Sequence, residues 1–183
     1  MSLGMLTLPR VGFGLVSLQS MKFLILGAPC SGKTTLVNLI RESQQFAVPV
    51  LEMDEEIRKL NDGEWPEDNG HQSSSKIYDT VAGMEKVIFF TSYLPDERLH
   101  SMTKDDFKII QLQCPLDILL KRNAERMKND PTLDNESLGI MDNVTWQRKV
   151  LDQGIVSIMV DANVSLKNTE KEIVTILKRE SES

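Results

Sequence analysis

The stretch FLILGAPCSGKTTL, residues 23–36, constrains the fold more than any other part of this 183-residue chain. It opens with a continuous apolar run, which is typical of a strand buried on both faces of a parallel sheet. The segment that follows has apolar residues at helical spacing, namely Leu36, Val37, Leu39 and Ile40. A strand and a helix are therefore joined here by a short loop that contains two glycines.

That loop fits the pattern G-x-x-x-x-G-K-[ST] of a phosphate-binding P-loop. Glycines allow successive backbone N–H groups to point into one concavity, and the N-terminus of the next helix adds positive potential. We expect Lys33 to reach the terminal phosphates of a nucleotide and the Thr34 hydroxyl to coordinate Mg²⁺. The sequence thus predicts ATP and Mg²⁺ as cofactors, with a nucleotide-binding segment made up of Gly27, Ala28, Pro29, Cys30, Ser31, Gly32, Lys33, Thr34 and Thr35.

Apolar runs and helical patterns alternate along the rest of the chain. We expect strands at 22–27, 46–53, 86–94, 107–113 and 155–161, and helices at 32–46, 54–63, 75–86, 116–128, 144–154 and 165–181. Pro49 indicates that the second strand lies at a sheet edge or begins irregularly. Such alternation predicts an α/β fold, a three-layer α/β/α P-loop NTPase with a mostly parallel five-stranded sheet and a small lid.

Composition narrows the range of partners. The net charge of −6 argues against a broad basic surface for nucleic acid. Cys30 and Cys114 form neither a disulfide framework nor a zinc spacing, and they suit a reducing, cytoplasmic location. No apolar run is long enough to span a membrane. We expect residues 1–20 to be a leader or a cloning remnant outside the fold, and 21–183 to be a single domain, monomeric or homodimeric, that binds a small-molecule acceptor.

An acidic segment follows the second expected strand. Glu55 and Glu56 are best explained as exposed carboxylates that complement the dipole of a helix beginning at Asp54, its expected N-cap. Asp54 itself lies where open α/β sheets bind ligands, at the carboxyl end of a strand. Its carboxylate either accepts a proton from a substrate hydroxyl or holds water on Mg²⁺. A purely solvated helix start is the alternative.

The expected helix at 116–128 carries Arg122 and Arg126 four residues apart on one face. One guanidinium there could stack on the base and the other could neutralise charge on a transferring phosphoryl group. The alternative is a solvated basic face paired with Glu125. A polar segment at about 128–146 is the predicted lid, which would exclude water, and Arg148 after it would supply further charge when the lid closes.

In its order of motifs the chain resembles the nucleotide and small-metabolite kinases: adenylate kinase, shikimate kinase and gluconate kinase. EMDEEI is similar to the acidic D-x-D-x-x-I element of shikimate kinases, with Glu52 at its first Asp and Asp54 at its second. RNAER is similar to the R-x-x-x-R helix of adenylate kinases, which implies that Arg122 covers adenine and Arg126 meets phosphate. MDN followed by Arg148 resembles the lid exit of adenylate kinases and implies a phosphate-facing arginine.

The sequence departs from those families where they organise the acceptor. Thr91 and Ser92 lie toward the end of the third expected strand, where adenylate kinases have Asp-Gly and shikimate kinases have glycines. The acceptor-binding arginines have no clear match either, and Arg58 and Arg98 are candidates by position only. The acceptor is therefore expected to be neither AMP nor shikimate.

Together these features predict a kinase that transfers the γ-phosphoryl group of ATP to a small metabolite, with Lys33, Asp54, Arg122, Arg126 and Arg148 as catalytic residues and Thr34 and Asp54 at the metal. The chain lacks the Asn-Lys-x-Asp of GTPases and the Leu-Ser-Gly-Gly signature of transporter ATPases. Two alternatives stay open, a nucleoside monophosphate kinase and a nucleotide-binding regulatory protein that transfers nothing.

Overall fold

The computed structural model describes residues 21–68, 70–130 and 136–182. Its five strands form one sheet in the order β2-β3-β1-β4-β5, and every pair of neighbours is parallel. The strands are β1 (Met21–Gly27), β2 (Val50–Glu52), β3 (Lys86–Thr91), β4 (Lys108–Gln113) and β5 (Ile158–Asp161). The predicted α/β fold is confirmed.

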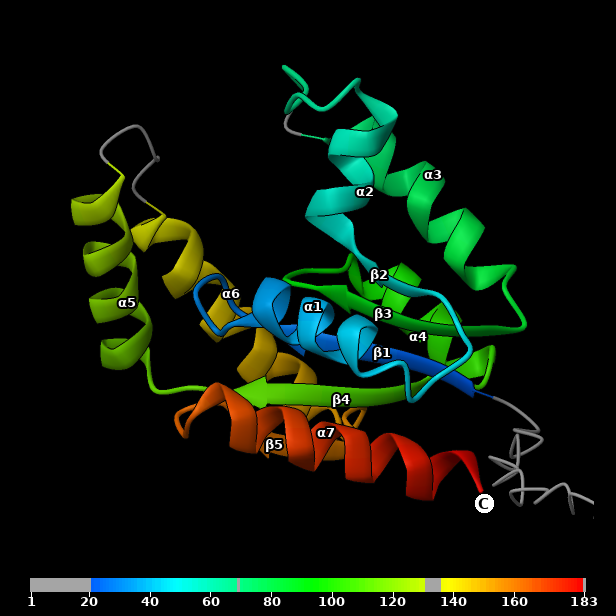
Figure 1. The fold of residues 1–183 in the computed structure, drawn as a ribbon. Coiled ribbons are helices and arrows are strands. Elements are labelled where there is room, and N and C mark those ends of the chain that lie inside the picture. The colour runs from blue at the N-terminus through cyan, green and yellow to red at the C-terminus, as the bar shows by residue number, and fades with distance from the viewer. Residues whose placement is uncertain (1–20, 69, 131–135, 183) are drawn as a thin grey trace, which may run out of the picture.

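Helices connect the strands and cover both faces of the sheet (Figure 1). They are α1 (Lys33–Ser43), α2 (Met53–Leu60), α3 (His71–Ala82), α4 (Asp96–Lys104), α5 (Leu116–Asn129), α6 (Ser137–Asp152) and α7 (Leu166–Ser181). In Figure 1, α1 and α7 lie in front of the sheet while α4 and α6 lie behind it. This arrangement is the expected three-layer architecture.

The alternation of side chains along β1 divides the hydrophobic core in two. Phe23 and Ile25 join buried residues of α1 and α7 on one face. Leu24 and Leu26 join residues of α2, α3, α4 and α6 on the other. Because β1 is central and buried on both faces, the end of this strand is a rigid base for the loop that follows it.

Several boundaries differ from those expected. The second strand is only three residues long and begins directly after Pro49, at an edge of the sheet, as the proline indicated. The N-cap of α2 is Glu52, not Asp54. Helix α4 was not predicted, since only Leu99 and Met102 of its nine residues are buried and the apolar pattern is sparse.

The predicted lid spans three different parts of the chain. Residue 128 belongs to the end of α5, and residues 131–135 lie outside the described part. Residues 137–146 belong to α6, so the chain is helical here where a loop or short helix was expected. The expected leader at 1–20 also lies outside the described residues. Within the described ranges, no helix combines the length and apolar character needed to cross a bilayer.

Candidate nucleotide-binding site

The P-loop joins the central strand β1 to α1 at the carboxyl edge of the sheet (Figure 1). Its backbone turns through two residues with positive φ, Cys30 at 64° and Gly32 at 94°. At Gly32 a side chain would also collide with Leu166, whose Cδ2 lies 2.7 Å from the position of a Cβ. Gly27 is constrained by space, since a Cβ there would lie 2.6 Å from Ser31 Oγ. The loop therefore needs both glycines of the motif.

Lys33, the first residue of α1, has its ammonium folded back over the loop. Its side chain is 7% exposed, and Nζ donates a hydrogen bond to the carbonyl oxygen of Ala28 at 3.2 Å. Burial lowers the pKa of Lys33, and the carboxylates of Asp54 and Glu52 oppose that shift. An ammonium has three donors, so this buried cation has spare capacity for an anion in the loop.

Thr34 lies beside an acidic residue, Glu52, that was not predicted as a metal ligand. Thr34 Oγ1 donates to Glu52 Oε1 at 2.8 Å. Glu52 is the last residue of β2, and at 3% exposure it is buried. Burial raises the pKa of Glu52, against the effects of the Thr34 hydrogen bond and the Lys33 charge. Its place at the carboxyl end of a strand was the signal that could have identified it.

These groups suit Mg²⁺ and phosphate. Hydroxyl and carboxylate oxygens are the ligands that Mg²⁺ prefers, and the ion usually takes only one or two carboxylates from the protein and the remainder from phosphates and water. The described residues contain no group of three or more His, Cys, Asp or Glu side chains that could hold a metal ion. Ser31 Oγ, inside the loop, is buried and has no hydrogen-bond partner among the described residues. A phosphate oxygen is a fitting acceptor for that hydroxyl.

Asp54 occupies the first turn of α2, exposed to solvent. Its carboxylate has no hydrogen-bond or ion-pair partner within the described part of the chain, although it lies close enough to influence Lys33 electrostatically. The neighbouring acids are engaged differently: Glu55 pairs with Arg41 and Lys59, and Glu56 pairs with Lys59. Among these three acids, Asp54 is the one whose carboxylate forms no ion pair with another described residue.

Arg122 bridges two loops at the edge of the site. Its guanidinium donates to the carbonyl oxygen of Cys30 at 3.4 Å and to that of Ala162 at 3.1 Å. The first contact is to the P-loop and the second is to the segment after β5. Arg122 therefore links the P-loop to the segment after β5.

Arg126, one turn further along α5, forms an ion pair with Glu136 at 3.0 Å. Its Nε is buried without a hydrogen-bond partner among the described residues. Arg126 also affects the pKa of Cys30, so its charge lies near the P-loop. The structure therefore brings Arg122 and Arg126 to the same side of the loop.

Arg148 lies elsewhere. It is exposed on α6 and lines a pocket together with residues of β4 and β5, to which none of the P-loop residues contributes. The acceptor candidates also differ from what their positions suggested. Arg98 forms an ion pair with Asp79, and the guanidinium of Arg58 lies over the ring of Trp65 at 5.5 Å.

Hydrogen bonds fix the end of β3 and the turn that follows it. Thr91 is 2% exposed, and its hydroxyl donates to the carbonyl oxygen of Tyr93 at 2.9 Å. The carbonyl of Ser92 accepts a hydrogen bond from Asn143 Nδ2 at 2.7 Å. Thr91 is therefore a structural residue of this turn, and Asn143 ties the turn to α6.

Comparisons with solved structures identify the fold. Shikimate kinase from Acinetobacter baumannii, in complex with shikimate, matches with a TM-score of 0.64 at 16% identity over 88% of this chain and 96% of that one. Shikimate kinase from Aquifex aeolicus matches with a TM-score of 0.65 at 22% identity, over 88% and 98%. The fold is that of P-loop kinases.

A gluconokinase from Sinorhizobium meliloti also matches, with a TM-score of 0.56 at 19% identity over 90% of this chain and 95% of that one. No protein-family model matches the sequence. The search of curated proteins finds no match either. At these identities the likeness concerns the fold, and the chemistry must be argued from the residues of this chain.

Proposed function

We propose that this protein is an ATP-dependent kinase that transfers the γ-phosphoryl group to a hydroxyl or phosphate group of a small metabolite, in a reducing, cytoplasmic compartment. The observation that carries the proposal is the group formed by Lys33 and Thr34 of the P-loop and Glu52 at the end of β2. A buried ammonium with free donors lies next to a hydroxyl and carboxylate suited to a metal ion. Such a combination fits a triphosphate with its Mg²⁺ better than it fits a neutral ligand.

In this proposal the P-loop N–H groups and Lys33 bind the β- and γ-phosphates. Thr34 and Glu52 would hold the magnesium, which when bound would supply positive charge at the phosphate oxygens. Arg122 would cover the base, because it already spans the P-loop and the segment after β5. Arg126 would turn from Glu136 toward the transferring group and stabilise its charge.

Asp54 is proposed to bind the acceptor and to act as its general base. The acceptor oxygen attacks the γ-phosphorus of ATP. The bond between the γ-phosphorus and the β,γ-bridging oxygen breaks, so that ADP leaves. When the acceptor is a hydroxyl, its proton passes to the Asp54 carboxylate. Asp54 suits this role because its carboxylate is exposed and lies close enough to Lys33 to act on its charge. Arg148 has no part in this mechanism, since it lines a different pocket.

A small acceptor is supported by the fold shared with shikimate kinases and a gluconokinase, whose names specify small metabolites. Arg98 already forms an ion pair and the guanidinium of Arg58 already lies over an aromatic ring, so these two cations are not favoured as ligands of the acceptor. A polar, weakly charged acceptor is therefore favoured over a nucleoside monophosphate.

The test is a screen for ATP consumption with Mg²⁺ and a panel of acceptors: nucleosides, nucleoside monophosphates, sugars, sugar acids and shikimate. The expected result is turnover with one class of small acceptor. Lys33→Met should abolish transfer and leave the fold intact, and Asp54→Asn should lower kcat strongly for a hydroxyl acceptor. Lys104→Met, at the exposed end of α4, is the matched control and should behave as wild type.

Each outcome separates the alternatives. Turnover restricted to nucleoside monophosphates would identify a nucleotide kinase. Tight ATP binding without transfer to any acceptor would favour a regulatory nucleotide-binding protein, which the Thr91–Ser92 segment leaves open. Full activity of Asp54→Asn would remove Asp54 from the mechanism.

A further inference from the structure

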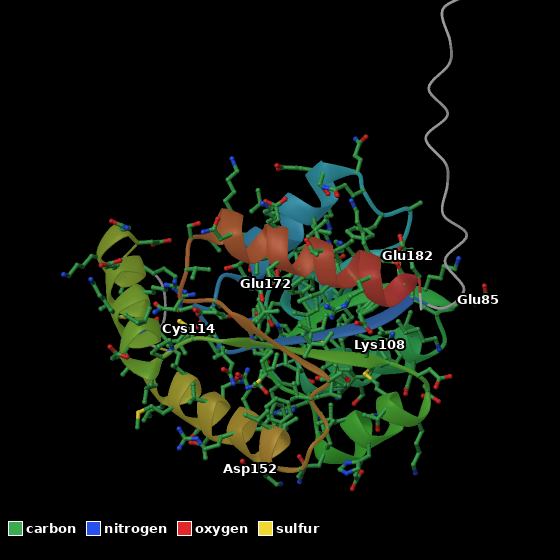
Figure 2. The ribbon with its side chains drawn as sticks, turned by 90° about the horizontal axis from the view of Figure 1, so that it is seen from below. Glu85, Lys108, Cys114, Asp152, Glu172 and Glu182 are labelled. Carbon is green, nitrogen blue, oxygen red and sulfur yellow. The ribbon has the colours of Figure 1, made fainter. Side chains whose placement is uncertain are left out.

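A second pocket lies on the face of the sheet covered by α6. Its walls come from the carboxyl halves of β4 and β5, the turn that starts at Cys114 and one side of α6. Figure 2 shows Cys114 at the end of β4 and Asp152 at the far end of α6, which runs along this side of the sheet. The pocket has a volume of about 420 Å³, which is within the range of small-molecule sites.

The alternation of β4 turns a polar side chain into this pocket. Gln111 has the same parity as Ile109, which belongs to the core beneath α4 and α6. Gln111 is 4% exposed and its Oε1 has no hydrogen-bond partner among the described residues. Gln147 of α6, also buried, is already bonded to Asn143 through its amide nitrogen. An unpaired buried carbonyl oxygen of this kind calls for a donor from whatever occupies the pocket.

Two opposite charges line the same pocket without meeting. Arg148 from α6 and Asp161 from β5 both contribute to its wall, and no ion pair joins them or links either to another described residue. One oxygen of Asp161 accepts a hydrogen bond from the backbone N–H of Asn163 at 2.8 Å. The other oxygen remains for a ligand. Val144 and Leu151 supply apolar surface next to these groups.

We propose that this pocket binds a small zwitterion of the α-amino-acid class. Its carboxylate would pair with Arg148, in the bidentate geometry that guanidinium favours. Its ammonium has three donors, enough for Asp161 and for the unpaired oxygen of Gln111. An aliphatic side chain would lie against Val144 and Leu151. No P-loop residue lines the pocket, although its Cys114 and Val144 pack in the same apolar cluster as Ala28 and Cys30 of the P-loop.

The test is calorimetry on the full chain without nucleotide, titrating each of the common L-amino acids. At least one with an aliphatic side chain should bind one-to-one. Propionate and butylamine, which each keep one of the two charges, should bind about 10-fold to 100-fold more weakly, because a charged hydrogen bond is lost in each case.

Three variants locate the site. Gln111→Leu, Arg148→Met and Asp161→Asn should each weaken binding about tenfold or more, and circular dichroism checks that they fold. The Asp161 variant keeps an oxygen for the Asn163 N–H, so the turn is retained. Lys171→Met, exposed on α7, is the charge-matched control and should bind as wild type. The proposal is overturned if no amino acid binds, if neutral nucleosides bind here instead, or if binding survives all three substitutions.

Discussion

Alanine substitutions at three glycines, one in the P-loop and two outside it, separate the cost of backbone strain from the cost of a steric contact. Gly32 combines a φ of 94° with a neighbour, Leu166 Cδ2, at 2.7 Å from a Cβ. Gly63 has a similar φ of 95° but nothing within 4 Å. Gly139, inside α6, also has open space around a Cβ, and its φ is not positive. Alanine therefore introduces backbone strain and a steric contact at Gly32, backbone strain alone at Gly63, and neither at Gly139.

The expected magnitudes follow from these environments. Alanine with positive φ costs about 1–2 kcal/mol, and rotating the half-exposed end of Leu166 away costs about 0.5–1.5 kcal/mol. The lower entropy of the unfolded chain returns about 0.4–1 kcal/mol. Gly32→Ala should therefore destabilise the protein by about 0.5–3 kcal/mol, and Gly63→Ala by about 0–1.5 kcal/mol. Gly139→Ala should stabilise it by about 0.5–1 kcal/mol because helical alanine is favoured.

The assay is thermal and urea unfolding of the full chain, where 1 kcal/mol corresponds to about 2–4 °C in Tm for a domain of this size. The predicted order of stability is Gly139→Ala, wild type, Gly63→Ala, Gly32→Ala. Equal stability of Gly32→Ala and wild type would refute the described loop conformation. So would a loss for Gly139→Ala as large as that for Gly32→Ala, since generic sensitivity to alanine would then explain both.

Two further predictions concern the surroundings of the P-loop. Burial raises the pKa of Glu52 above its ordinary value of 4.5. Between 4.5 and the raised pKa, the folded protein therefore keeps a proton that the unfolded chain has released. The free energy of unfolding without nucleotide should fall as the pH rises through this interval. Glu52→Gln should remove this fall, as urea unfolding at a series of pH values would show; an unchanged pH profile would contradict the assignment. Arg41 donates from Nε and Nη2 to the carbonyl oxygen of Val50, at 2.9 and 2.6 Å, and pairs with Glu55. Arg41→Met should therefore lower the free energy of unfolding by about 1–3 kcal/mol, and a change within experimental error would mean that these bonds add nothing.

The sequence predicts the fold well where local and global patterns agree. The apolar run of β1 and the amphipathic pattern of α1 are dictated by burial, and both appear where expected. Helix α4 was missed because it buries only Leu99 and Met102 and its remaining residues are compatible with a loop. The order of the strands depends on contacts between segments far apart in the chain, which periodicity does not encode.

The candidate site follows the same division. The P-loop is a local motif, so its geometry could be expected from spacing alone. The bond between Thr34 and Glu52 joins β2 to α1, and it depends on how the two segments pack. Arg148 was predicted from its place after a lid, but the helical phase of α6 turns it toward β4 and β5. The position of Arg148 after the predicted lid was therefore not enough to predict which face of α6 it occupies.

Calorimetry of Mg-ATP binding to the full chain tests the central claim most directly. We predict one-to-one binding for the wild type, and at least about tenfold weaker binding for Lys33→Met, because a charge-assisted bond to phosphate is lost. No detectable heat with folded wild-type protein, or equal affinity for the two proteins, would contradict the account.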